Sequence, residues 1–151
     1  MDYSFRPHPG GGAIHELTLY PVIGNCAGLD KGMYQYDPLN HALTGMKVTD
    51  DHIDELLDRA WITGDSKSKP QVFFAITARP ERIQWKYESM VYAVIIKNVG
   101  ALCQTLYLNA TAMGLAPTAL GGGNSDHFAK VTSLPYYHET LVGEFLVGSK
   151  K

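Results

Sequence analysis

The segment 88–113 constrains the fold of this chain more than any other part of its sequence. Its apolar residues recur every three or four positions, which is the period of a helix. They are Val91, Ile95, Val99, Leu102, Leu106, Ala110 and Met113. The opposite side also carries Val94, Ile96 and Leu108, so a helix ~39 Å long, at ~1.5 Å per residue, would be apolar nearly all round. Such a helix needs cover on several sides, which contact with a second subunit would supply.

The rest of the chain predicts short strands and helices in a fold of the α+β class. Five segments have the apolar or β-branched content of strands: 17–23, 32–38, 42–48, 72–77 and 141–147. The run 72–77 is apolar throughout, which is typical of a central strand covered on both faces. Two further helices are expected, one between Thr49 and Gly64 and one that Asn124 or Ser125 caps.

Three consecutive glycines, Gly121, Gly122 and Gly123, follow the long helical run and precede the last expected helix. Without Cβ atoms, such a loop lets a flat or charged ligand approach backbone N–H groups that side chains would otherwise cover. A connection that needs glycine only for positive φ angles accounts for the same residues. From the triplet alone, both interpretations stay open.

The composition limits what the chain can bind. Its 151 residues, 45% of them hydrophobic, fit one globular domain over 1–151. A net charge of −2 with scattered basic residues offers no stripe for a phosphate backbone, so we expect no nucleic-acid partner. No uninterrupted apolar run approaches the ~20 residues of a membrane span, and 1–12 lacks the apolar core of a signal peptide. We therefore expect a cytoplasmic protein without a membrane partner.

The two cysteines and six histidines show no metal-binding spacing. Cys26 lies in a polar, glycine-rich segment and Cys103 lies in the apolar helix, so we expect two free thiols. A disulfide between them stays open as the less favoured alternative. No metal site is expected.

Six short blocks, spread over nearly the whole chain, carry a family resemblance. They are Arg6-Pro7 with GGAIHEL at 11–17, GMYQYDP at 32–38, WKY at 85–87, Gly100 with YLNA at 107–110, GGGNSD at 121–126 and VGEFLVG at 142–148. In this order they resemble the SagB-type branch of the nitroreductase-like flavoproteins. That branch includes FMN-dependent dehydrogenases that oxidise thiazoline or oxazoline rings to thiazoles or oxazoles in ribosomally made peptides.

The resemblance implies a nitroreductase-like α+β fold that forms a homodimer through its long helix, with FMN in the crevice between subunits. The family's first glycine block would line the flavin ring from one subunit, and it matches Gly10, Gly11, Gly12 and His15. The second block would come from the other subunit, and it matches Leu120, Gly121, Gly122, Gly123 and Asn124. Its backbone N–H groups would lie near flavin N5, where a donor stabilises the electron density that arrives with a hydride.

Lys86 and Tyr87 resemble the Lys-Tyr pair of azoline oxidases, which is associated with proton removal while hydride leaves to the flavin. Azoline oxidation requires a base for the C–H proton, and a neighbouring ammonium favours the ionised form of a tyrosine. The resemblance therefore implies that Lys86 and Tyr87 are catalytic. In the structural alternative, Lys86 extends along the surface at a helix start and Tyr87 packs beneath it.

The chain departs from the family at the phosphate end of the expected FMN site. Family members usually carry an early helical segment in which an arginine of an Arg-Arg-Ser-like motif holds the phosphate, and we expect no such segment here. Arg6 is a candidate replacement, because a guanidinium matches a phosphate well. The family's basic residue after the last strand matches Lys150 or Lys151 poorly. FMN is therefore expected to bind weakly without a further anchor.

Three functions stay open. The first is an FMN-dependent oxidoreductase, a homodimer that acts on a heterocycle in a modified peptide or on a small molecule. The second is a subunit of a hetero-oligomeric flavoenzyme, in which another chain completes the FMN site. The third is a flavin-free scaffold or peptide-binding partner, and the presence of Lys86, Tyr87 and the glycine triplet argues against it.

Overall fold

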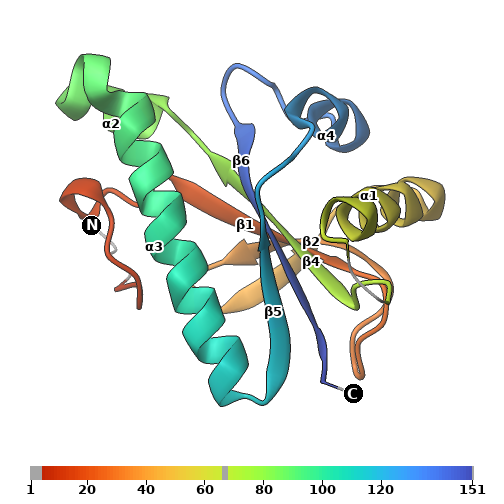
Figure 1. Ribbon diagram of the computed structural model, residues 1–151. Helices are drawn as coiled ribbons and strands as arrows, with labels where there is room; N and C mark the ends of the chain where they lie inside the picture. The colour runs from red at the N-terminus through yellow and green to blue at the C-terminus, as the bar shows by residue number, and fades with distance from the viewer. Residues whose placement is uncertain (1–4, 66–67, 151) are drawn as a thin grey trace.

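The computed structural model describes residues 5–65 and 68–150, and within them six strands form one sheet through the middle of the molecule (Figure 1). The strand order is β3-β2-β1-β4-β6-β5, and neighbouring strands are antiparallel. The strands are β1 (Leu17–Ile23), β2 (Gly32–Asp37), β3 (Ala42–Gly45), β4 (Val72–Ala78), β5 (Leu115–Leu120) and β6 (Thr140–Ser149). The expected α+β class is confirmed, and β4 is central as predicted.

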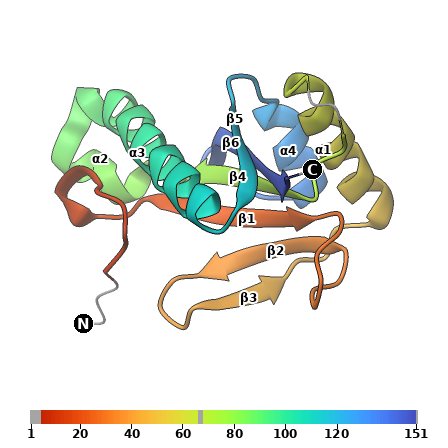
Figure 2. The ribbon, with the colours of Figure 1, turned by 60° about the horizontal axis from the view of Figure 1, so that its bottom comes forward.

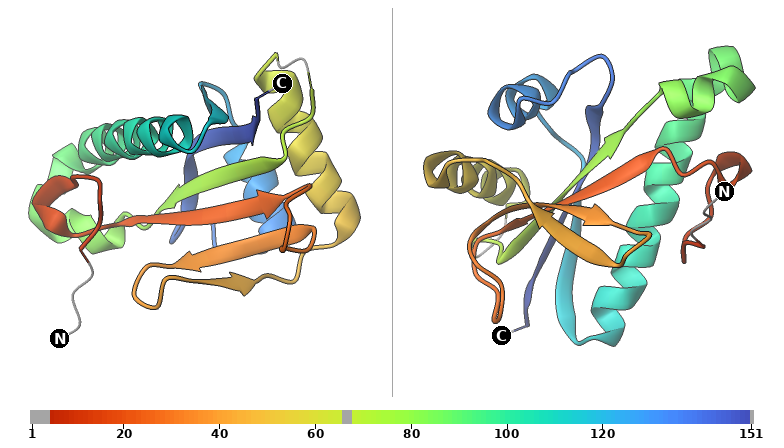
Figure 3. Two further views of the ribbon diagram at one scale, coloured as in Figure 1. Left: turned by 90° about the horizontal axis from the view of Figure 1, so that it is seen from below. Right: turned by 180° about the vertical axis from the view of Figure 1, so that it is seen from behind.

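Helices cover both faces of the sheet (Figures 1 and 3). On one face, α1 (Asp50–Thr63) and α4 (Ser125–Thr132) cover a buried apolar cluster that includes Phe73 of β4. On the other face, α3 (Val91–Ala112) covers a second cluster that includes Ile76 of the same strand. Because β4 contributes side chains to both clusters, its sequence is apolar throughout.

The long apolar helix is present, but it begins at Val91 rather than at residue 88 and ends at Ala112. A short helix, α2 (Glu81–Tyr87), and a 3-10 turn, η2 (Glu88–Met90), precede it, and neither was predicted from the sequence. Glu88 has a φ of 45°, which interrupts the helical backbone between α2 and α3. As a result, Lys86 and Tyr87 lie in the last turn of α2 rather than at a helix start.

One side of α3 packs on the sheet, and the other side is exposed. The buried side includes Val94 and Val99. The exposed side carries an uncharged and largely apolar row at every fourth residue, here called the α3 stripe: Tyr92, Ile96, Gly100, Gln104 and Leu108. Tyr92 is 73% exposed and Leu108 is 62% exposed, so the part of the chain that the structure describes leaves this face without apolar cover.

Among the described residues, the segment Glu81–Ala112, which comprises α2, η2 and α3, is long and apolar enough to cross a membrane, judged by length and composition alone. Its most apolar window has a mean hydropathy of 1.4, and 28% of that window is buried inside the fold. The expectation that no run approaches a membrane span overlooked this segment, because isolated polar residues such as Lys97 and Asn98 interrupt it. The absence of a membrane partner stays a prediction.

The strand β5 was missed from the sequence, where the chain was expected to pass from the long helix directly into the glycine triplet. Pro117 lies inside this strand and weakens its sequence signal. β5 is an edge strand, where a proline is tolerated because only one side of the strand needs backbone donors. The hairpin β2–β3 extends the opposite end of the sheet beyond the helices (Figure 2).

Candidate functional site

The first glycine loop, residues 10–15, lies directly against Lys86 and Tyr87. A Cβ built on Gly12 would lie 2.6 Å from Lys86 Nζ and 3.2 Å from Tyr87 Oη. A Cβ built on Gly11 would lie 2.6 Å from Val94 Cγ1 and 3.3 Å from Tyr87 Oη. Gly12 also has a φ of 60°, which favours glycine. The structure therefore brings these two glycines together with both expected catalytic side chains.

Lys86 and Tyr87 contact each other as well as the loop. Lys86 Nζ lies 5.8 Å from the centroid of the Tyr87 ring, within the range of a cation–π contact. Lys86 is exposed, and Tyr87 is half-buried with its hydroxyl against the glycine backbone. Both side chains thus face the first glycine loop from the end of α2, so the sequence neighbours do share one site.

A buried hydrogen-bond chain holds the first glycine loop onto α3. The Gly11 N–H donates to Asn98 Oδ1 at 3.0 Å, and Asn98 Nδ2 donates to Glu16 Oε1 at 2.7 Å. Asn98 and Glu16 are both buried, and Glu16 is only 1% exposed. Because Asn98 already binds the Gly11 N–H, this group is not free to bind a ligand. Asn98 and Glu16 were both missed as site residues from the sequence.

Two histidines flank the same loop. The rings of His8 and His15 lie 6.0 Å apart in an edge-to-face arrangement. Burial, and to a lesser degree the Arg6 guanidinium, lowers the pKa of each imidazole, so both favour the neutral form. His15 Nδ1 is buried and has no hydrogen-bond partner among residues 5–65 and 68–150. Of the residues that match the first glycine block, His15 therefore keeps a polar atom available.

The second glycine loop, residues 120–124, separates two cavities of about 320 Å³ and 400 Å³. The smaller cavity reaches α1 and the larger one reaches Tyr92 and Ile96 of α3. A Cβ built on Gly121 would meet nothing within 4 Å, whereas one on Gly122 would lie 3.3 Å from Thr63 Cγ2. The space beside Gly121 is therefore open to a ligand.

The two flanking residues of the second glycine loop have structural roles. Leu120 is half-buried at the end of β5 and packs against the apolar cluster under α1 and α4. Asn124 caps α4, because its Oδ1 accepts a hydrogen bond from the His127 N–H at 2.8 Å. The prediction that Asn124 or Ser125 caps this helix is confirmed for Asn124.

Glu144 on β6 lies beside the second glycine loop and was missed as a site residue from the sequence. It lines both cavities, and a Cβ built on Gly123 would lie 3.1 Å from the Glu144 carboxyl carbon. Burial raises the pKa of this carboxyl to about 7. The one available signal was its position, since it is the charged residue within the apolar run 141–147.

The two glycine loops lie on opposite sides of α3 within one chain (Figure 1). The first contacts α3 through Val94 and Asn98, while the second shares its larger cavity with Tyr92 and Ile96. A single chain therefore does not bring the two loops into one crevice.

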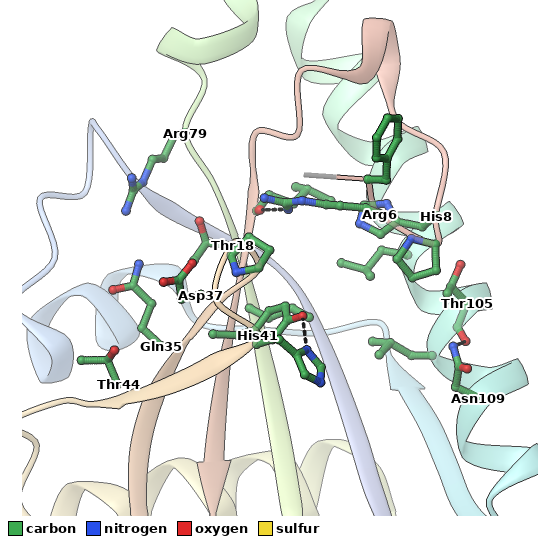
Figure 4. A pocket seen from close by; sticks show the side chains of 18 of the residues that line it. Arg6, His8, Thr18, Gln35, Asp37, His41, Thr44, Arg79, Thr105 and Asn109 are labelled. Carbon is green, nitrogen blue, oxygen red and sulfur yellow. Dashed lines mark hydrogen bonds between the residues drawn. The ribbon is translucent and has the colours of Figure 1, made fainter. Parts of the chain in front are cut away.

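Arg6 lines a cavity with a volume of about 720 Å³ (Figure 4). The cavity lies between residues 5–8, β1, the β2–β3 hairpin and the second half of α3. Arg6 Nη1 donates to the Leu17 carbonyl at 3.0 Å, and its buried Nε has no hydrogen-bond partner in the described ranges. Burial and then the nearby Arg82 lower the pKa of the Arg6 guanidinium. Arg6 thus keeps donors for an anion, as a phosphate-binding residue must.

Lys150 lies far from the second glycine loop in the same chain. In the β5–β6 ladder, Leu120 pairs with Glu144 and Leu115 pairs with Ser149, so the second glycine loop and Lys150 are at opposite ends. This separation is ~17 Å at ~3.4 Å per residue. Lys150 is exposed, and Lys151 lies outside the described residues. Arg6, Gly121 and Lys150 therefore do not meet in one chain.

The cysteine expectation is confirmed, since Cys26 and Cys103 are both free thiols. Cys103 lies on α3, where burial raises the pKa of its thiol. Within residues 5–65 and 68–150, the structure contains no cluster of three or more histidine, cysteine or acidic residues that could hold a metal ion.

Comparison with known proteins places this fold and these loops in a family. The model of the Nitroreductase family matches residues 8–149. The trifolitoxin-processing protein TfxB of Rhizobium leguminosarum bv. trifolii is 32% identical over 142 residues, which are 92% of this chain and 38% of that protein. A Methanocaldococcus jannaschii protein named as a nitroreductase candidate is 23% identical over 133 residues, which are 88% of this chain and 66% of its own length.

Solved structures share the fold. The E. coli microcin synthetase McbBCD complex with truncated pro-MccB17 bound contains a chain that superposes with a TM-score of 0.82 at 24% identity, over 97% of this chain and 56% of that one. A nitroreductase family protein from Clostridium difficile 630 has a TM-score of 0.62 at 14% identity, over 95% of this chain and 65% of its own. The present chain thus spans less than two thirds of each of these relatives.

These observations define the class of the protein. It has an α+β fold with one sheet, a long apolar helix and two glycine loops. The match over residues 8–149 shows that the chain belongs to the nitroreductase family, which is a family of oxidoreductases. The similarity to TfxB and to the microcin synthetase chain is consistent with the SagB-type branch of that family.

Proposed function

We propose that this chain is an FMN-dependent oxidoreductase that oxidises a thiazoline or oxazoline ring in a modified peptide. Membership of the nitroreductase family supports the redox class. The relatives named for trifolitoxin processing and for microcin synthesis with a bound peptide precursor support a peptide substrate. The observation that carries the proposal is the contact of Lys86 and Tyr87 with Gly11 and Gly12.

In this proposal Tyr87 removes the proton from the azoline ring. Its hydroxyl is held at the glycine backbone, where a ring stacked on the first glycine loop would present its C–H bond. The Lys86 ammonium beside the Tyr87 ring stabilises the phenolate oxygen that takes this proton, and the proton transfer leaves the tyrosine neutral. FMN, when bound, supplies the chemistry that the side chains lack, because it accepts the hydride.

The residues of the chain fit an FMN ring better than an FMN phosphate. Gly121 leaves an open space beside a backbone that can donate hydrogen bonds, and His15 keeps a polar atom free at the first glycine loop. Arg6 is the one expected phosphate ligand with an unpartnered buried donor among the described residues. The expected role of Lys150 has no support from its position in the same chain.

A homodimer through the α3 stripe would complete the site. The stripe is uncharged and exposed, as an interface requires, and dimerisation would cover Tyr92, Ile96 and Leu108. It would also allow the first glycine loop of one subunit to face the second glycine loop of the other. The separation of the two loops across α3 within one chain supports this arrangement.

A hetero-oligomer is the alternative, and one observation favours it. The structural relative from E. coli is part of a McbBCD complex, so a chain of this fold does assemble with other subunits. In such an assembly a partner chain contributes a phosphate ligand beside Arg6. Flavin absorbance near ~450 nm in the purified chain, compared with and without a co-expressed partner, distinguishes the two assemblies.

Titration of the purified chain with FMN tests the proposed function. Quenching of flavin fluorescence at micromolar concentrations supports it, and no quenching at tens of micromolar rejects a self-sufficient flavoenzyme. Turnover of an azoline-containing peptide then tests the substrate class.

A further inference from the structure

We propose that Glu144 carries a proton between the two cavities that flank the second glycine loop, and exchanges it with a nitrogen or oxygen atom of a heteroaromatic ligand. This inference rests on the proposed function, which supplies such a ligand in the FMN ring. Glu144 is distinct from Lys86 and Tyr87, which lie at the other glycine loop.

The position of Glu144 suits this role because its carboxyl reaches both cavities. The residue lies on β6 opposite Leu120 of β5, where the second glycine loop begins. Its carboxyl carbon is 3.1 Å from the site of an added Cβ on Gly123, so a side chain at position 123 would press on the carboxyl in its present position. The glycine loop therefore separates the two cavities, and Glu144 is shared between them.

The groups around Glu144 do not neutralise it. Arg59 of α1 and His127 of α4 line the smaller cavity, but both lie against Glu55. Arg59 Nη2 is 3.0 Å and His127 Nε2 is 3.3 Å from Glu55 Oε1. Tyr92 of α3 and Tyr136, which precedes β6, line the larger cavity and carry no positive charge. Within residues 5–65 and 68–150, the Glu144 carboxyl has no hydrogen bond or ion pair. Its environment therefore favours the protonated form.

The burial of this carboxyl places its titration in the useful range for proton transfer. Burial alone raises the pKa of Glu144 to about 7, so both the acid and the carboxylate are populated near neutral pH. A group with this property transfers protons most effectively at the pH of the cell. The two cavities give the carboxyl access to the ligand on one side and to water on the other. The raised pKa allows the carboxyl both to release and to take up a proton near neutral pH.

The proposed step moves a proton and no electrons through the side chain. Glu144 gives up its proton as the carboxyl O–H bond breaks, and an N–H or O–H bond forms on a ligand that has gained a hydride from the substrate. The carboxylate left behind takes a proton from water in the smaller cavity. The same steps run backwards when the ligand is reoxidised, so charge and atoms balance in both directions.

The test uses FMN as the ligand and reads its reduction potential as a function of pH. In the wild-type chain, we expect the slope of potential against pH to change near neutral pH, because the ionisation of Glu144 is coupled to reduction. Glu144→Gln should bind FMN and lose this change of slope. Asp30→Asn, an exposed carboxyl-to-amide change in the β1–β2 connection, should keep it.

The outcomes separate this inference from the proposed function. If FMN binds and the slope changes identically in the wild-type and Glu144→Gln chains, Glu144 does not exchange the proton and the inference is wrong. If the wild-type chain binds no FMN, the proposed function fails first and this inference fails with it. Should Glu144→Gln not fold, a constant slope in the wild-type chain alone is sufficient to overturn the inference.

Discussion

Asn98 Oδ1 on α3 accepts a hydrogen bond from the Gly11 N–H at 3.0 Å, and this bond holds the first glycine loop against the long helix. The same amide donates to the buried Glu16 carboxyl at 2.7 Å, so its orientation is determined from both ends. This bond links two segments that are 87 residues apart in the sequence. It also aligns the loop with Lys86 and Tyr87, because Gly11 and Gly12 contact both.

Asn98→Leu should therefore displace the first glycine loop. The change leaves the buried Glu16 carboxyl and the Gly11 N–H without their Asn98 partner. We expect this to lower the free energy of unfolding by about 1–3 kcal/mol. We also expect FMN to bind about tenfold more weakly, which corresponds to ~1.4 kcal/mol. Denaturant unfolding and FMN titration measure the two effects. Asn25→Leu, at an exposed asparagine in the β1–β2 connection, is the control, and an equal loss of FMN affinity there would show that Asn98 has no specific role.

The α3 stripe gives a prediction about assembly. Leu108→Arg introduces a charge on a side chain that is 62% exposed in the single chain, so it should leave the fold intact and dissociate a dimer formed through this face. The mass in solution should then fall to that of one chain, with loss of FMN binding. Leu39→Arg, at a 56% exposed leucine in the β2–β3 connection, should change neither. A Leu108→Arg variant that keeps the wild-type mass would exclude the stripe as the interface.

The raised pKa of the Glu144 carboxyl should make the free energy of unfolding depend on pH. Its pKa rises from 4.5, its ordinary value, to about 7 in the folded chain, so the folded state binds the proton more tightly than the unfolded state. The resulting stabilisation is complete below the unfolded pKa and is lost as the pH rises through the folded pKa, by about 3 kcal/mol at ~1.4 kcal/mol per unit. Glu144→Gln should remove this part of the pH dependence. Chemical unfolding at several pH values measures it, and identical curves for the two proteins would show that Glu144 titrates normally.

Tyr87→Phe separates catalysis from binding. The variant removes only the hydroxyl at the first glycine loop, so FMN affinity should be unchanged while turnover of an azoline peptide falls by ~10²–10⁴-fold, the usual contribution of a general base. Tyr137→Phe, at a 92% exposed tyrosine, should retain full turnover. Equal rates for wild type and Tyr87→Phe would assign Tyr87 to packing.

The sequence predicted those parts of the fold that carry a long periodic signal. The spacing in α3 and the apolar run in β4 both identified their elements, because a helix that packs on a sheet and a strand buried on two faces leave strong patterns. β5 escaped because Pro117 weakens a six-residue strand, and α2 escaped because its seven residues bury only Ile83. Short elements depend on tertiary packing more than on their own sequence.

The candidate site was only partly predictable. The resemblance identified the two glycine loops and the Lys86-Tyr87 pair, and the structure brings the first loop and that pair together. Asn98 and Glu144 each interrupt an apolar run, which marks them as unusual but does not say what they contact. That information depends on how α3 and β6 pack against the loops, and no local pattern encodes it.

We propose that one FMN site is formed by the first glycine loop of one subunit and the second glycine loop of another. Gly121→Val should block the second loop without disturbing the fold, because an added Cβ there meets nothing within 4 Å of the chain. Gly45→Val on exposed β3, where an added Cβ would meet only Tyr34 at 3.9 Å, is its control and should bind FMN normally.

The most direct measurement is an FMN titration of a heterodimer of Asn98→Leu and Gly121→Val chains. The two chains are co-expressed with different tags, and the heterodimer is purified through both tags in turn. Each variant alone impairs one loop in every site. In the heterodimer, a shared site predicts that one of the two crevices has both loops intact, so FMN should bind with wild-type affinity at half the stoichiometry of the wild-type dimer. A heterodimer that binds no better than its parent variants would contradict a site built from two subunits.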